Sequence, residues 1–186
     1  MHILKRSFKM QKIMFFMYLF VVILGFIFAV SFMTQYSNLF GLELPLNDGI
    51  RIFHDNMQIF DRFMFYSSLV GLVSIIFIYA LEVNKKVCDR FALIVLGVFV
   101  AFLIGSSIFS LIRLTQLLGE YKSVDFKYIS IEDPEIVDYQ LRFETFYIGY
   151  VLNAFSILVF LIFLGNLIFN HIKFLKLKKE GALNDN

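Results

Sequence analysis

Cysteine is almost absent from this chain of 186 residues, which contains one cysteine, Cys88, and only two prolines. A single cysteine excludes an intramolecular disulfide framework and any metal site built from several cysteines. Charged residues are also scarce, because they make up 17% of the chain, whereas about a quarter of an average soluble domain is charged. The formal net charge of +2 gives no indication of a nucleic-acid partner.

Hydrophobic residues are in excess, at 59% of the chain with a mean hydropathy of +0.76. Average soluble domains are roughly half apolar, so this chain has more apolar surface than a water-soluble core can bury. The 25 phenylalanines and 9 tyrosines exclude intrinsic disorder. The composition therefore predicts an integral membrane protein and excludes a water-soluble single-domain enzyme.

Four long gaps separate the charged side chains along the chain. They follow Lys12, Arg62, Arg90 and Glu144 and contain 30, 19, 22 and 28 uncharged residues, respectively. About 20 apolar residues in a helix cross the roughly 30 Å hydrocarbon layer, and a charge at its centre costs at least about 2.5 kcal/mol. The gaps predict an all-α integral membrane protein with a single domain over residues 1–186. Its four transmembrane helices are expected near residues 13–34, 63–81, 91–112 and 146–169.

A closed transmembrane barrel is the alternative spanning structure. Its strands have about 10 residues of alternating polarity, whereas these segments are continuously apolar, so helices are favoured. The first segment begins like a secretory signal peptide, since basic residues precede it. The apolar run that follows is too long for a cleaved signal, which predicts a retained signal anchor.

Basic residues concentrate in the two terminal segments and in the link at 82–90, which together hold 11 lysines and arginines. The loops at 35–62 and 113–145 hold six basic and eleven acidic residues. Lysine and arginine are enriched on the cytoplasmic side of membrane proteins. We therefore predict two helical hairpins with both termini cytoplasmic and two long extracytoplasmic loops.

The first of these loops contains a helical pattern. Ile50, Phe53 and Met57 recur at helical spacing after Asn47 and Asp48, either of which is a favourable N-cap. This pattern predicts a helix that either lies in the membrane interface or extends the second span outward.

The second loop has two local signals. Residues 121–131 alternate partly between apolar and polar, which predicts a short extended segment. Asp133, Pro134 and Glu135 then combine an N-cap with proline at the first helical position. They predict the start of a helix that runs directly into the fourth span.

Small residues recur four apart at Gly97, Ala101 and Gly105, on one face of the third span. Small side chains at this spacing let another backbone approach closely, which is a common mode of helix association in lipid. The same device recurs in the first two spans, at Gly25 with Ala29 and at Ser67 with Gly71. Two interpretations stay open: packing within the chain's own bundle, or a seam for another subunit.

Polar residues suggest two further positions of interest. Asn153 lies inside the fourth span, where an amide either bonds to a neighbouring helix or contacts a substrate or ion. His54, Gln58 and Asp61 share one helical face, either as half of a metal or acid–base site at the outer interface or as a solvated surface. We assign no catalytic residue, cofactor or metal, because the spans contain no cysteine pair, no paired histidines and no charged side chain.

A basic cluster follows the fourth span. It comprises Lys173, Lys176, Lys178 and Lys179. At a cytoplasmic membrane surface each of these cations attracts anionic lipid headgroups by roughly 1 kcal/mol, so lipid contact explains the cluster without nucleic acid.

Three hypotheses for function follow from these features. The first is a non-catalytic subunit or accessory protein of a larger membrane complex, which binds partners through its helix faces and outward loops. The alternative is a small transporter or channel subunit working as an oligomer, and the third is an interfacial enzyme acting on lipid or peptide. Abundant Phe, Ile, Lys and Asn, without an Asn-X-Ser/Thr acceptor, favour a bacterial cytoplasmic membrane.

The predicted orientation can be tested by cysteine labelling. In a Cys88→Ser background, we expect a membrane-impermeant maleimide added to intact cells to label Asp138→Cys and to leave Lys85→Cys unlabelled until the cells are lysed. Labelling of both positions from the same side would contradict the assignment of the loops.

Overall fold

Four long α-helices make up the regular structure of the described part of the chain. The computed structural model describes residues 2–36, 48–83, 90–123 and 143–179. The helices are α1 (His2–Tyr36), α2 (Asp48–Val83), α3 (Arg90–Ser123) and α5 (Glu144–Lys179). Each has 34 to 36 residues and is therefore about 50 Å long. The prediction of an all-helical chain with four potential spans is confirmed.

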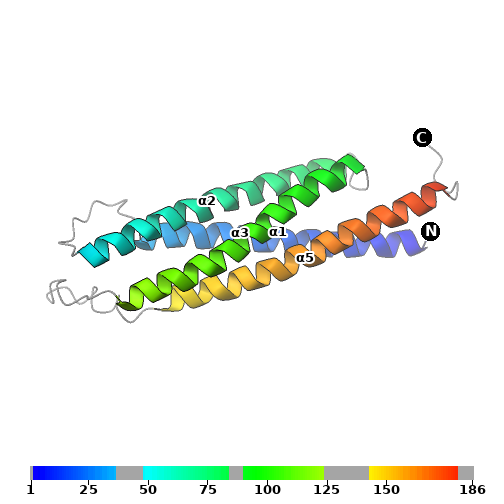
Figure 1. The fold of residues 1–186 in the computed structure, drawn as a ribbon. Coiled ribbons are helices and arrows are strands. Elements are labelled where there is room, and N and C mark those ends of the chain that lie inside the picture. Colours follow the sequence, from blue (N-terminus) through cyan, green and yellow to red (C-terminus); the bar gives the residue numbers. More distant parts are fainter. Residues whose placement is uncertain (1, 37–47, 84–89, 124–142, 180–186) are drawn as a thin grey trace.

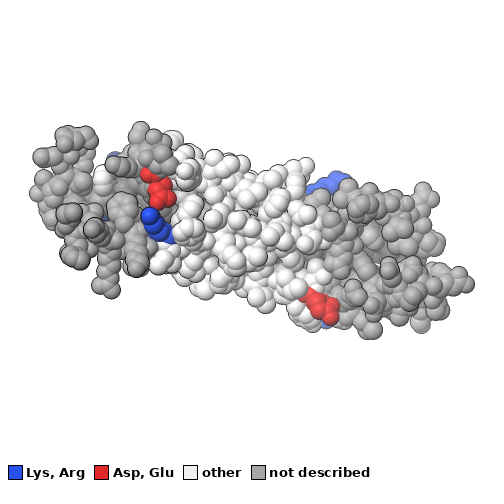
Figure 2. Space-filling model, turned by 180° about the vertical axis from the view of Figure 1, so that it is seen from behind, with Lys and Arg blue, Asp and Glu red and all other residues white. Residues whose placement is uncertain are grey.

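Each helix contains a stretch that is long and apolar enough to cross a membrane. These stretches are Lys12–Ser31, Ile52–Glu82, Arg90–Ser123 and Glu144–Lys176. Large apolar side chains point outward from every helix, for example Phe16, Ile76, Phe91 and Val151, each more than half exposed. One face of the molecule shows a broad band of uncharged residues with charged side chains on either side of it (Figure 2). The chain is a multi-pass membrane protein.

The helices extend well beyond the predicted spans. Residues 48–62 and 113–123, which we assigned to loops, are helical. The helix expected in the first loop is continuous with the second span from Asp48 onward, so it is an extension of that span and not a separate helix. Charged residues near the ends of these helices do not interrupt them, because beyond the hydrocarbon layer a charge is solvated.

The second loop is mostly outside the described residues. The extended segment predicted for residues 121–131 is wrong at its start, because residues 121–123 belong to α3. Residues 124–131 and the helix start predicted at Asp133, Pro134 and Glu135 lie outside the described part of the chain.

The four helices form an antiparallel bundle in which each helix packs against two others. α1 contacts α2 and α5, and α3 contacts the same two helices from the other side. Successive helices run in opposite directions, so the start of α1 and the end of α5 lie at the same end of the bundle (Figure 1). The two predicted hairpins, α1 with α2 and α3 with α5, are therefore neighbours in one bundle.

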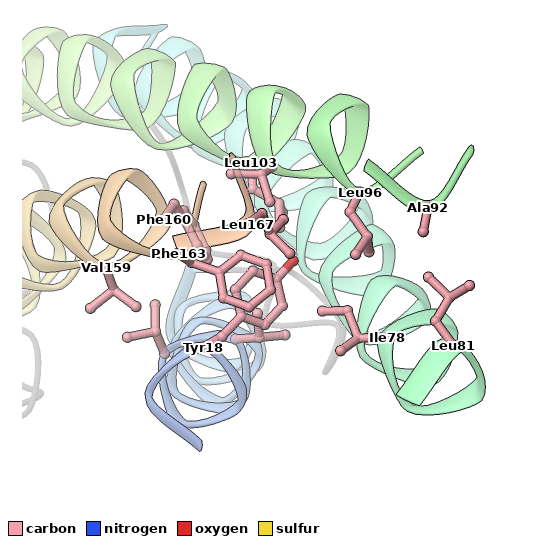
Figure 3. Packing of buried hydrophobic residues seen from close by; sticks show 13 residues of the cluster. Tyr18, Ile78, Leu81, Ala92, Leu96, Leu103, Val159, Phe160, Phe163 and Leu167 are labelled. Atoms are coloured by element: carbon pink, nitrogen blue, oxygen red, sulfur yellow. The ribbon is translucent and has the colours of Figure 1, made fainter. Parts of the chain in front are cut away.

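A buried tyrosine lies in the half of the core nearest the start of α1 and contacts two other helices. The Tyr18 ring lies 4.5 Å from the Phe163 ring and 5.4 Å from the Phe160 ring, between centroids, and Figure 3 shows it among apolar side chains from the other helices. Its hydroxyl lies 2.6 Å from Ser74 Oγ on α2. Because Ser74 donates its own hydrogen to the Gly71 carbonyl, the Tyr18 hydroxyl is the donor. This bond ties α1 to α2.

A second cluster fills the other half of the core. Tyr121 at the end of α3 packs with Phe53 on α2 and Phe146 on α5, with ring centroids 5.4 and 5.7 Å apart, respectively. Near the same end, Asn56 on α2 donates a hydrogen bond of 2.9 Å to Glu120 on α3. Aromatic packing and a polar contact therefore join three helices beyond the middle of the bundle.

Two glycines allow the helices to approach closely. A Cβ atom added at Gly149 on α5 would lie 2.9 Å from Leu114 Cδ1 on α3 and 2.9 Å from Phe28 Cζ on α1. A Cβ atom at Gly71 on α2 would lie 2.9 Å from Val22 Cγ1 on α1. Gly165, also on α5, has open space at the equivalent position.

We expect Gly149→Leu to lower the free energy of unfolding by about 1–3 kcal/mol, the usual cost of forcing extra carbon atoms into a packed interior. Gly165→Leu, with the same change in helix propensity, is the matched control and should remain close to the parent protein. The measurement is loss of helical circular dichroism during SDS titration of the purified chain in mixed micelles. Equal effects of the two substitutions would contradict the close approach at Gly149.

Candidate functional site

The small-residue face of the third span lies on the outside of the bundle. Ala101 and Gly105 are exposed and Gly97 is half-buried. A Cβ atom built at Gly97 or Gly105 meets no atom of the described residues within 4 Å. The described residues therefore leave open space beside Gly97 and Gly105, and this favours the interpretation of a seam for another subunit over packing within the chain's own bundle.

The corresponding pairs in the first two spans behave differently. Gly71 and Ser67 are buried, and Gly71 is one of the two close approaches between helices. Ala29 is buried in the second core cluster, whereas Gly25 has no atom within 4 Å of an added Cβ. Of the small residues in these two pairs, Gly71 is the one at which the described helices approach closely.

A cavity lies inside the bundle between the two core clusters. Its volume is about 70 Å³, and residues from all four helices line it. Val22, Leu103 and Phe160 of the first cluster border it on one side, and Met64 of the second cluster borders it on the other. The two clusters therefore do not merge into one continuous apolar core.

Asn153 borders this cavity. Its Nδ2 atom donates a hydrogen bond of 2.8 Å to the Gly149 carbonyl one turn earlier in α5. This bond lies within a single helix, so it does not join α5 to a neighbour. The carboxamide of Asn153 adds a polar group to the lining at a depth where the surrounding spans are apolar.

The face formed by His54, Gln58 and Asp61 is only partly accessible in the structure. His54 and Gln58 are half-buried, but Asp61 is only 2% exposed. Neither carboxylate oxygen of Asp61 has a hydrogen-bond partner within the described ranges. The described residues also contain no group of three His, Cys, Asp or Glu side chains that could hold a metal ion. The interpretation of this face as a solvated surface does not hold for Asp61, because its side chain is buried.

The lysines after the fourth span belong to the last turns of α5. Lys176 and Lys179 are exposed and Lys173 is half-buried, while the side chain of Lys178 is outside the described set.

The sequence analysis missed the serines that line the cavity. They are Ser67, Ser68, Ser106, Ser107, Ser110 and Ser156. The available signal was three serines among residues 106–110 of an otherwise apolar span. Hydroxyl side chains in a transmembrane helix usually face other helices, so this group marked the inner face of α3.

Substitution of Asp61 tests whether the burial of its carboxyl group lowers the stability of the fold. At an alkaline pH that ionises the Asp61 carboxyl, we expect Asp61→Asn to raise the free energy of unfolding by about 1 kcal/mol, because a buried carboxylate without a partner is costlier than a neutral amide. Asp55→Asn, at an exposed position one and a half turns earlier in α2, should leave stability unchanged. A large loss of stability in Asp61→Asn would show that the carboxylate makes a stabilising interaction.

The described arrangement offers hydroxyl and amide groups inside the bundle and a face of small residues outside it. Comparisons of this chain with protein families, with curated proteins and with solved structures give no match.

Proposed function

We propose that this chain is a non-catalytic subunit or accessory protein of a larger membrane complex, and that a transmembrane helix of a partner protein docks on the outer face of α3. The observation that supports this proposal is the uncovered small-residue face at Gly97, Ala101 and Gly105. Because no described helix of this chain packs closely on this face, a helix of another protein can pack there.

The depth of this face determines what kind of partner fits it. Gly97, Ala101 and Gly105 lie within the stretch of α3 that contains no charged side chain. Backbone groups in lipid must be satisfied within their own segment, so a partner segment at this depth is a helix. Small residues allow two helix backbones to approach closely and gain van der Waals contact, which is what drives association when lipid surrounds both.

The remaining elements of the proposal concern the setting of the chain. We infer a bacterial cytoplasmic membrane with both termini on the cytoplasmic side, on the strength of the lysine and arginine distribution. In this orientation Lys173, Lys176, Lys178 and Lys179 contact anionic headgroups, and the two long loops contribute to partner binding from outside.

A second candidate function is a small transporter or channel subunit that works as an oligomer. The cavity lined by serines inside the bundle favours it. In that case the partner on α3 is a second copy of this chain. An interfacial enzyme that uses Asp61 and His54 has less support, since the Asp61 carboxylate is nearly inaccessible.

The docking face can be tested in the native membrane. We expect the double variant Gly97→Leu and Gly105→Leu to reduce recovery of a stoichiometric membrane partner about tenfold, which corresponds to about 1.4 kcal/mol, because the leucine side chains keep the two helix backbones apart and remove their van der Waals contact. The measurement is quantitative mass spectrometry of the complex purified in mild detergent. Gly165→Leu, at another glycine with open space around it, is the control and should retain the partner.

A photo-crosslinking residue at position 101 identifies what lies on this face. We expect it to crosslink to a transmembrane helix of a different protein, and we expect no such product from position 161, where Leu161 is exposed on α5. Crosslinks to a second copy of this chain would favour the oligomeric transporter. Unchanged partner recovery in the double variant would contradict docking on α3.

A further inference from the structure

Four of the serine hydroxyls that border the cavity in the middle of the bundle make no hydrogen bond with the described residues. Ser67 and Ser106 are each 9% exposed, Ser107 is 8% exposed and Ser110 is 4% exposed. The described residues make no hydrogen bond to any of these four hydroxyls, although all four side chains line the cavity. They come from two helices, α2 and α3, that face each other across it.

Other serines in the same bundle show what an ordinary buried serine does. Ser68 donates to the Phe65 carbonyl at 2.7 Å, Ser74 to the Gly71 carbonyl at 2.6 Å and Ser156 to the Leu152 carbonyl at 2.7 Å. A serine in an apolar helix satisfies its hydroxyl through its own backbone when nothing better is available. The oxygens of the four cavity serines are not among the enclosed side-chain atoms that lack a partner, so they are open to the cavity and are placed to bond to a molecule inside it.

Close helix packing does not account for this arrangement. Small side chains are used at helix interfaces to remove space, but a cavity of about 70 Å³ remains between these serines. Alanine would also serve close packing as well as serine does, because it is similarly small and has no polar group that needs a hydrogen-bond partner. The hydroxyl groups therefore require an explanation beyond their size.

The chemistry of the lining limits what the occupant can be. The described residues around the cavity include seven with hydroxyl or carboxamide groups and none that is ionisable. Hydroxyls both donate and accept hydrogen bonds, whereas an ion would be buried without a counter-charge at a high cost. One water requires about 10–15 Å³ measured in this way, so the space holds about five waters or a solute of similar size.

We propose that this cavity binds one small uncharged molecule rich in hydroxyl groups, of about the size of glycerol, through Ser67, Ser106, Ser107 and Ser110. The hydroxyls of the ligand form the hydrogen bonds that the serine hydroxyls would otherwise make with water. This binding site is independent of partner docking on α3, since the cavity and the small-residue face lie on different sides of that helix.

Glycerol is the probe for this site. The full chain is reconstituted in lipid nanodiscs, and binding is followed by saturation-transfer NMR of free glycerol during a titration. We expect saturable binding of glycerol and no binding of lactate, which is similar in size but carries a charge. The double variant Ser107→Ala and Ser110→Ala should bind glycerol at least about tenfold more weakly, the effect of losing one or more hydrogen bonds.

Ser123→Ala is the matched control, because Ser123 is exposed and bonds to the Glu120 carbonyl at the end of α3. It should bind glycerol as the parent chain does, and helical circular dichroism confirms that each variant is folded. The absence of saturable glycerol binding would overturn the proposal and leave only water in the cavity. Unchanged affinity in the double alanine variant would also overturn it, because the glycerol would then be bound elsewhere.

Discussion

The absence of water from the lipid around the central part of each helix is the constraint on which this structure depends. Without water, each backbone N–H and C=O group needs a partner within its own segment, so the spanning elements are helices. The same condition keeps charge away from the centre, and the stretch of α3 between Arg90 and Arg113 contains none. Helices of about 50 Å are longer than the hydrocarbon layer is thick. Their ends are therefore in polar surroundings, where contacts such as that between Asn56 and Glu120 form.

Lipid also changes what holds the bundle together. Lipid tails are as apolar as leucine, so burying an apolar side chain against another helix gains little from the hydrophobic effect. Specific fit then decides which faces meet. Gly149 lets α5 approach Leu114 and Phe28. The Tyr18 ring packs against two aromatic rings of α5, and its hydroxyl bonds to Ser74 on α2. These contacts fix the register of α1, α2 and α5 in a bundle whose inner and outer surfaces are both apolar.

The four helices were predictable because charged residues are excluded from the hydrocarbon layer, so each long stretch without charge marks a segment that crosses it. Their ends were not, because such a gap marks the layer and not the helix. α2 begins at Asp48 and α3 ends at Ser123, each more than ten residues outside the gap. The inward faces were also not predictable, since Gly97 and Gly105 have the same small-residue signature as Gly71 but lie on the outside. The cavity depends on distances between four helices, which no local pattern in the sequence contains.

The two features with functional interest meet on α3. Gly105 is exposed on its outer side, and the next two residues, Ser106 and Ser107, are buried against the cavity. One helix therefore carries both features, each on its own side. Alanine at the serine positions would have a similar size and would bring no polar group into an apolar span. A fold that retains costly polar groups at its centre is under a constraint other than stability, which is where function is expected.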